Sequence, residues 1–521
     1  MTEKLNMIFY YILTFFVGLF IISSFFIRAE FNYYLYGDNP ILQDQQLWTF
    51  LLYVLLLLVV GFLLYPLFRR LNRFSKHIVI PVVLLISFLI QWAIIIYFPV
   101  LPTADSLKLL TIASDMLYHA DYSAFDKGGY LFRFPYNFSM VLYFKTLLAI
   151  FPENYEIIKL FNILFSLITT LFIYGIYKEL SPRPKENEYG ILIFAAMYLP
   201  SLFMCNYVYN DIIATTFFTG AIYFFVSFIK DKKPVRLVTA AILLSGGNYF
   251  RNIGAIFLIA AVLYLLLRGK EIGFRKLVAS FLILISLFWL PAWAQDTYLQ
   301  ATHKVTNSIY QNSAPVHLWL NMGIDTKRLG FFDHKKSYKI YEIEADYNKE
   351  RSKELFLEEI KRKFRKATAN EIVNMYYSKL IWTWTEGTYQ IDRYGIGVDP
   401  PSIKNKKLFI MGGYRYSTTA TQLFNRDNHY RGSLLWALYV MNFLIYCFIF
   451  VRLVRSVRDK RFDEALLVIV ILGFVGFYLL WEIKSRYLYP VYPILLILSY
   501  FGYQDAYHFL LRRYYNSNNP L

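Results

Sequence analysis

The chain has 521 residues, of which 57% are apolar, 20% aromatic and only 17% charged, against about 25% charged residues in ordinary soluble domains. This balance excludes a soluble enzyme and a disordered chain, and it indicates a polytopic membrane protein. The net charge of +18 does not suggest nucleic acid, because basic excess in membrane chains marks cytoplasmic loops and contacts with anionic lipid. The two cysteines, Cys205 and Cys447, lie in apolar stretches, which excludes a disulfide framework and cysteine-pair zinc sites.

Apolar stretches of about 20 residues predict membrane-spanning helices. About twelve spans are expected, over Met7–Ile27, Trp48–Phe68, Ile78–Phe98, Ile157–Tyr177, Tyr189–Met204, Ile212–Ile229, Leu237–Phe250, Ile253–Leu267, Lys276–Trp293, Leu435–Val454, Leu466–Trp481 and Tyr487–Leu510. With these spans every short basic loop falls on the same side of the membrane as both termini. Since Lys and Arg collect in short cytoplasmic loops, that side is expected to be the cytoplasm.

Two stretches allow a second interpretation. Phe138–Phe151 is short for a span, and if it crossed the membrane, the basic loops 178–185 and 230–236 would fall outside. We therefore expect it to lie flat at the outer membrane surface. The stretch 237–267 reads either as one long helix or as a hairpin broken near Gly246–Asn248 and Arg251–Asn252. The hairpin keeps the next basic loop cytoplasmic and is preferred.

The expected fold is an all-α polytopic membrane protein with four parts. Residues 1–77 hold two N-terminal transmembrane helices, and 78–295 form a transmembrane module whose outer loop, 99–156, carries interfacial helices. Residues 296–433 form a large extracytoplasmic region, and 434–521 hold the last three helices. Within the outer region, Lys349–Lys366 predicts a charged, solvated amphipathic helix.

This topology gathers unusual polar residues on the outer face. They are Asp105 in the first outer loop, Tyr209 and Asp211 before the sixth span, Arg251 at the hairpin tip, Trp382, Trp384 and Glu386 in the outer region, and Glu482, Lys484, Arg486 and Tyr487 in the last outer turn. Asp105 is either a solvated carboxylate or a catalytic one, and Asp211 either caps a helix or belongs to a site. The two cations of the last turn are interfacial anchors or phosphate ligands, and the tryptophans are an interfacial belt or a sugar platform.

Taken together, these residues have the chemistry of group transfer from a lipid-linked phosphate. A cation pair such as Lys484 and Arg486 stabilises a phosphate as negative charge develops on it. A carboxylate such as Asp105 accepts the proton of an attacking hydroxyl. One carboxylate suffices, because a lipid phosphate leaves as an anion without a general acid.

The same residues resemble the C-type glycosyltransferase superfamily (GT-C), in particular bacterial members similar to protein mannosyltransferases. The resemblance is carried by Thr103-Ala104-Asp105-Ser106 with Arg133-Phe134-Pro135-Tyr136-Asn137, by Tyr209-Asn210-Asp211 followed by Arg251-Asn252, and by Trp481–Pro490. It implies that Asp105 is the base and that Arg251, Lys484 and Arg486 bind the donor phosphate. Tyr209, Asp211, Glu482, Tyr487, Trp384 and Glu386 would position substrate. The chain departs from the family in its two additional N-terminal helices and in its single first-loop carboxylate.

The expected function is an inverting glycosyltransferase of the cell membrane, with its active site on the extracytoplasmic face. The donor would be a polyprenyl-phosphate sugar, and the acceptor a cell-envelope polysaccharide, teichoic acid, lipid or protein. Two alternatives stay open: a transporter or flippase of lipid-linked saccharides, and a non-catalytic membrane partner of a glycan synthase. No cofactor is assigned, although Asp105 and Asp211 sharing a divalent cation stays open. Membrane lipids are expected partners, and nucleic acid is not.

The topology is testable by placing accessibility tags in the loops. Tags in 179–188, 230–236, 268–275 and 455–462 are expected to be cytoplasmic, and a tag in 340–370 external. A cysteine-labelling assay on intact cells distinguishes the two sides. A cytoplasmic 340–370 tag would remove the basis for a single outer site.

Overall fold

The computed structural model describes residues 2–32, 39–182, 186–326, 329–397, 417–426 and 428–518. This part of the chain is helical apart from one hairpin and one isolated bridge. Seven of its helices are long and apolar enough to cross a membrane by length and composition, and Gly254–Leu267 and Ala465–Leu480 are shorter apolar helices. These features are consistent with a polytopic membrane protein, and the total of twelve spans stays a prediction.

The N-terminal part contains the β-hairpin. It comprises α1 (Thr2–Ser24), β1 (Ile27–Asn32), β2 (Asn39–Asp44), α3 (Leu47–Leu71) and α4 (Lys76–Tyr97). The strands pair antiparallel, and the alternating residues Ala29 and Phe31 of β1 are buried, as the two-residue period of a strand requires. The prediction of helix up to Ile27 was therefore wrong at its end, because the chain leaves α1 at Ser24 and turns into the hairpin.

Residues 99–156, predicted to form the first outer loop, contain a series of short helices. They are α5 (Asp105–Tyr118), η1 (Ser123–Phe125), α6 (Tyr130–Arg133), η2 (Pro135–Asn137) and α7 (Phe138–Ile150). α5 packs against α7, and both contribute to an apolar cluster that also takes Leu318, Tyr341 and Phe356 from the outer region. The first outer loop and the outer region therefore share one core.

The middle of the chain forms α8 (Glu156–Leu180), α9 (Tyr189–Ala196), α10 (Leu199–Met204), α11 (Asp211–Asp231), α12 (Pro234–Phe250), α13 (Gly254–Leu267), α14 (Gly269–Ile272), α15 (Phe274–Phe288) and α16 (Leu290–Ala301). The predicted hairpin is confirmed, with its break at 251–253; α12 runs without interruption through Gly246 and Gly247. A continuous helix over Tyr189–Met204 was wrong. Pro200 opens α10, and a proline removes a helix hydrogen bond and clashes with the preceding turn.

The outer region and the C-terminal helices complete the fold. They comprise α17 (Val316–Gly323), α18 (His334–Lys339), the π-helix η3 (Ile340–Glu344), α19 (Lys349–Lys366), α20 (Ala369–Thr385), α21 (Ile391–Tyr394), α23 (Thr419–Leu423), α24 (His429–Arg458), α25 (Ala465–Leu480), η4 (Ser485–Val491) and α26 (Tyr492–Asn518). The predicted helix Lys349–Lys366 is confirmed as α19. α20 was expected in the outer region. It instead packs into the apolar core that also contains residues of α1, α11, α24 and α25, which we call the main core, and Trp382 and Trp384 are buried there.

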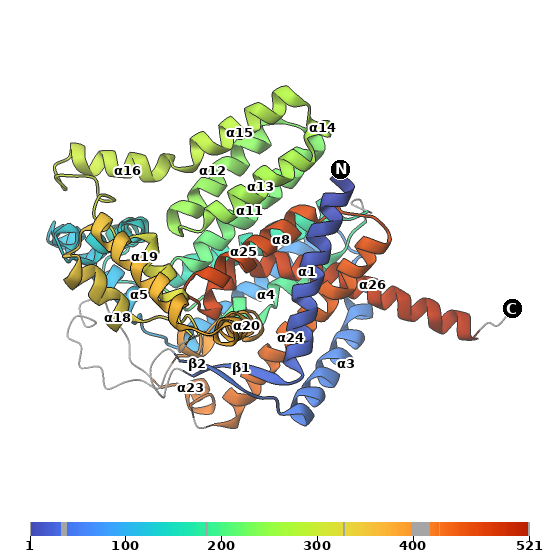
Figure 1. The fold of residues 1–521 in the computed structure, drawn as a ribbon. Helices are drawn as coiled ribbons and strands as arrows, with labels where there is room; N and C mark the ends of the chain where they lie inside the picture. Colours follow the sequence, from blue (N-terminus) through green and yellow to red (C-terminus); the bar gives the residue numbers. More distant parts are fainter. Residues whose placement is uncertain are drawn as a thin grey trace.

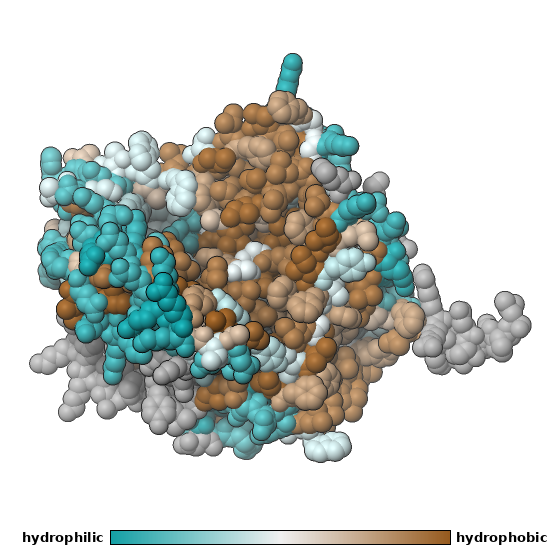
Figure 2. All heavy atoms as spheres, in the orientation of Figure 1, coloured by the Kyte–Doolittle hydropathy of each residue, from teal (hydrophilic) through white to brown (hydrophobic). Residues whose placement is uncertain are grey.

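The arrangement separates two polar ends. Figure 1 shows the N-terminus, α14 and the end of α26 on one side of the molecule, and α5, α18 and α19 on the opposite side. Figure 2 shows a broad band of apolar surface between them. Such a band suits a hydrocarbon environment.

Candidate active site

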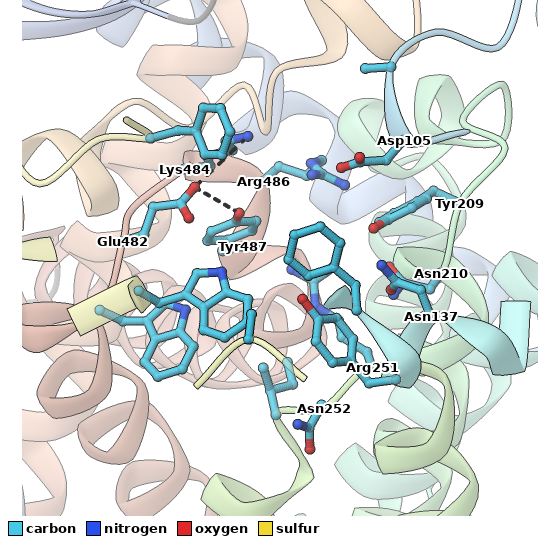
Figure 3. Close-up of a pocket in the computed structure, with 18 of the residues that line it drawn as sticks. Asp105, Asn137, Tyr209, Asn210, Arg251, Asn252, Glu482, Lys484, Arg486 and Tyr487 are labelled. Carbon is cyan, nitrogen blue, oxygen red and sulfur yellow. Dashed lines mark hydrogen bonds and ion pairs between the residues drawn. The ribbon is translucent and has the colours of Figure 1, made fainter. Parts of the chain in front are cut away.

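One large cavity collects residues from every outer segment that the sequence singled out. Its volume is about 1110 Å³, and its walls come from the first outer loop, the loop before α11, the α12–α13 turn, the outer region and the α25–α26 turn. Asp105, Tyr209, Arg251, Lys484 and Arg486 all line it. Figure 3 shows Asp105 and the Arg486 guanidinium pointing toward one another. Residues that are up to 381 positions apart in the sequence thus share one chamber.

Asp105 is placed in this cavity by a strained turn. It is the first residue of α5, and its predecessor Ala104 has φ 50° and ψ −125°, a conformation that L-residues rarely adopt. Such strain costs about 1–3 kcal/mol and persists only where the surroundings impose it. Ser106 is buried while Asp105 is exposed, so the turn directs this carboxylate into the open space.

The Asp211 carboxylate joins two arginines behind the cavity wall. Its Oδ2 accepts a hydrogen bond from Arg486 Nη1 at 2.7 Å, and its Oδ1 pairs with Arg251. Asp211 is fully buried, and Arg251 and Arg486 are nearly so. The cap interpretation of Asp211 is wrong: Asn210 occupies the N-cap position of α11 and Asp211 is its first helical residue, and both carboxylate oxygens of Asp211 face the arginines.

Arg486 is further enclosed by tyrosine rings. Its guanidinium carbon lies 4.9, 5.3, 5.1 and 5.6 Å from the ring centres of Tyr207, Tyr209, Tyr394 and Tyr487, within the range of cation–π attraction. Nη1 also donates to the Tyr207 hydroxyl at 2.6 Å. Its Nε has no hydrogen-bond partner among the described residues. The arginine is therefore fixed in place and keeps one donor unused.

Lys484 and Glu482 form a second charged pair on the same turn. Lys484 Nζ lies 4.0 Å from Glu482 Oε1, and the Tyr487 hydroxyl donates to that oxygen at 3.1 Å. The turn is tied to the outer region, because the Ile483 amide donates to the Gly330 carbonyl at 3.1 Å. The lysine side chain is only 12% exposed, so neither cation is a lipid-facing anchor.

Trp384 and Glu386 do not reach the cavity. Trp384 is stacked on Phe20 of α1, with ring centres 5.5 Å apart, and the Glu386 carboxylate accepts the Thr388 amide at 3.1 Å. Both side chains are buried in the main core. Neither side chain can therefore position a substrate in this cavity, and both interpretations of the buried tryptophan pair, an interfacial belt and a sugar platform, were wrong.

The outer region contributes lining residues that the sequence did not reveal. Trp319, Tyr338 and Lys349 line the cavity, and Lys349 Nζ is held by the Tyr310 carbonyl and Ser313 Oγ at 2.7 and 3.0 Å. Burial raises the pKa of Tyr338, and the nearby carboxylates of Glu482 and Asp105 raise it further. No local motif marks these residues, since only the folding of the outer region against the first loop brings them inward.

The described residues contain no group of three carboxylate, histidine or cysteine side chains placed to hold a metal ion. The cation that Asp105 and Asp211 would share is also not supported, because both oxygens of Asp211 are engaged by arginines.

Comparison with known proteins gives one finding. Residues 135–294 match the family model of the dolichyl-phosphate-mannose-protein mannosyltransferases. The match confirms the resemblance found in the sequence and supports a membrane glycosyltransferase. It includes Tyr209, Asp211 and Arg251, whereas Asp105 and the α25–α26 turn lie outside it. No curated protein and no solved structure matches the chain.

The Asp211 arrangement predicts a loss of both stability and donor affinity in Asp211→Asn. Removing one partner of a buried ion pair leaves uncompensated charge and costs about 3–5 kcal/mol. Thermal unfolding of the purified protein and binding of a polyprenyl-phosphate sugar measure the two effects.

Glu464→Gln is the matched control, because Glu464 is a buried carboxylate paired with Arg452 at the start of α25, remote in sequence from the lining residues of that helix. It is expected to lose similar stability and to keep donor affinity. If Asp211→Asn were as stable as wild type, the two buried arginines would not need this carboxylate to offset their charge.

Proposed function

We propose that this chain is an integral membrane glycosyltransferase that transfers a sugar from a polyprenyl-phosphate donor to an extracytoplasmic cell-envelope acceptor. One observation carries the proposal: Asp105 and a cation group from two distant turns face the same cavity. The family match over 135–294 supports transfer from a lipid-linked phosphate sugar. The basic loop that contains α14 lies on the opposite side of the molecule from α5, α18 and α19 (Figure 1), and since basic short loops collect in the cytoplasm, this supports an outward orientation of the cavity.

The donor phosphate is assigned to Arg251, Lys484 and Arg486. These three cations pair with two carboxylates, Asp211 and Glu482, and Asp105 faces Arg486 across the cavity (Figure 3). The group therefore has one net positive charge once Asp105 has accepted the proton of the acceptor hydroxyl. A polyprenyl-phosphate sugar carries one negative charge, and the departing polyprenyl phosphate carries up to two. A preorganised cation group therefore binds the leaving phosphate more strongly than the intact donor, and this difference lowers the barrier.

The reaction is a single displacement at the anomeric carbon. Asp105 accepts the proton of the acceptor hydroxyl, the new bond forms between that oxygen and the anomeric carbon, and the bond to the phosphate oxygen breaks. The electron pair of the broken bond stays on the phosphate, which Arg486 and Lys484 hold. With no covalent intermediate, the configuration inverts.

Asp211 and the tyrosines have a positioning role. Asp211 sets the separation of Arg251 and Arg486, while Tyr209 and Tyr487 bracket the Arg486 guanidinium. A guanidinium that is already fixed loses little conformational entropy when a phosphate binds. The arginines therefore favour phosphate binding through their rigid placement as well as through their charge.

The base assignment predicts that Asp105→Asn abolishes transfer and spares donor binding. The amide keeps the size of the side chain but cannot accept the proton, and loss of a general base costs about 10²–10⁴ in rate. Transfer from radiolabelled polyprenyl-phosphate-mannose to membrane acceptors, measured beside donor affinity, checks both halves.

Asp115→Asn, on the same helix but outside the cavity lining, is the control and should transfer normally. Near-normal transfer by Asp105→Asn would remove the base from this position. Movement of donor across the bilayer by a wild-type protein that transfers no sugar would instead favour a flippase.

A further inference from the structure

A continuous aromatic wall follows one side of the cavity. We define it as Phe134, Tyr136, Trp319, Phe477 and Trp481, all of which line the cavity. The indoles of Trp319 and Trp481 are parallel, 5° apart in plane with centres separated by 5.6 Å, and Phe477 stacks on Trp481 at 4.8 Å. The wall therefore joins the outer region, through α17, to the end of α25.

The wall also reaches the first outer loop, where the proposed base lies. Tyr136 contacts Trp319 edge-to-face, with ring centres 6.0 Å apart. Burial raises the pKa of Tyr136, and among the charges that raise it further is the Asp105 carboxylate. Tyr136 and Asp105 line the same cavity, so a ligand that rests on Trp319 and extends along Tyr136 enters the space that Asp105 faces.

The cavity has room for a second ligand beside the donor headgroup. Its volume of about 1110 Å³ exceeds the range of about 300–1,000 Å³ that encloses a single drug-sized ligand. The cations assigned to the donor come from the turns at 251 and 484–486, whereas Trp319 comes from the outer region. Phe477 and Trp481 lie just before the 484–486 turn, whereas Trp319 and Tyr136 lie on other segments of the chain. The wall therefore extends from the phosphate group toward the outer region and the first outer loop.

We propose that the aromatic wall binds a pyranose ring of the acceptor, which makes the acceptor of this enzyme a saccharide. The C–H groups on one face of a pyranose carry partial positive charge and pack against the negative π face of an indole. Hydrogen-bonding groups line the same cavity, among them Asn137, Ser313 and Tyr338, and such groups suit sugar hydroxyls. The inference rests on the proposed function, because it names the acceptor of that same site.

The test uses the full-length protein in lipid nanodiscs. Binding is measured on an array of neutral and phosphate-bearing oligosaccharides and on an array of serine- and threonine-containing peptides, and donor affinity is measured separately with polyprenyl-phosphate-mannose. Wild type should retain saccharides and not peptides. Trp319→Ala should weaken saccharide binding about tenfold and donor binding much less, and Trp319→Tyr, which keeps an aromatic face, should restore most of the loss.

Trp293→Ala is the control, because Trp293 is 64% exposed on α16 and lies outside the cavity lining; it should bind saccharides as wild type does. The inference would be overturned if the wild-type protein bound only peptides or bound no saccharide. It would also be overturned if Trp319→Ala bound saccharides as tightly as wild type. A greater loss of donor than of saccharide in Trp319→Ala would overturn it too, by assigning the wall to the donor sugar. Saccharide binding without any donor affinity in wild type would overturn the proposed function and leave the saccharide platform standing.

Discussion

The buried carboxylate of Asp211 is the contact on which the candidate site depends. It joins the start of α11, the turn between α12 and α13 and the turn between α25 and α26, because Arg251 and Arg486 both reach it. Two arginines buried side by side would repel one another and lose their hydration, and one carboxylate between them offsets both costs. The same contact fixes Arg486 among its tyrosines and sets which charges face the cavity. The contact therefore both holds these three segments together and arranges the charges of the site.

The sequence was sufficient to predict most of the helices and several of the residues that line the cavity. Spans such as α4 and α8 follow from apolar length alone, and α19 follows from its charged amphipathic pattern. The hairpin of α12 and α13 was predicted by charge, since a single helix would have moved the basic loop at 268 outside. Asp105, Arg251, Lys484 and Arg486 were found because each lies a few residues beyond a span, where polar side chains are conspicuous.

Contacts between distant segments were beyond the reach of sequence reasoning. Trp384 and Trp319 look alike in the sequence, yet one is stacked on Phe20 inside the main core and the other on Trp481 in the cavity. Only the path of α20 into the core decides between them. Asp211 lies at the start of an apolar span, where an aspartate commonly caps a helix. Its pairing with two arginines depends on how the start of α11 meets the turns after α12 and α25. The β1–β2 hairpin was missed because six-residue strands after a long apolar helix give too weak a pattern.

A structure of the Asp105→Asn variant with bound polyprenyl-phosphate-mannose tests the central claim most directly. This variant is expected to bind donor without turning it over, so the complex is stable enough for electron cryomicroscopy. The account predicts the phosphate within hydrogen-bonding distance of Arg486 and Lys484, with the anomeric carbon facing residue 105 and Asp211 still holding the arginines. Phosphate density away from these cations, or an anomeric carbon facing away from residue 105, would contradict it.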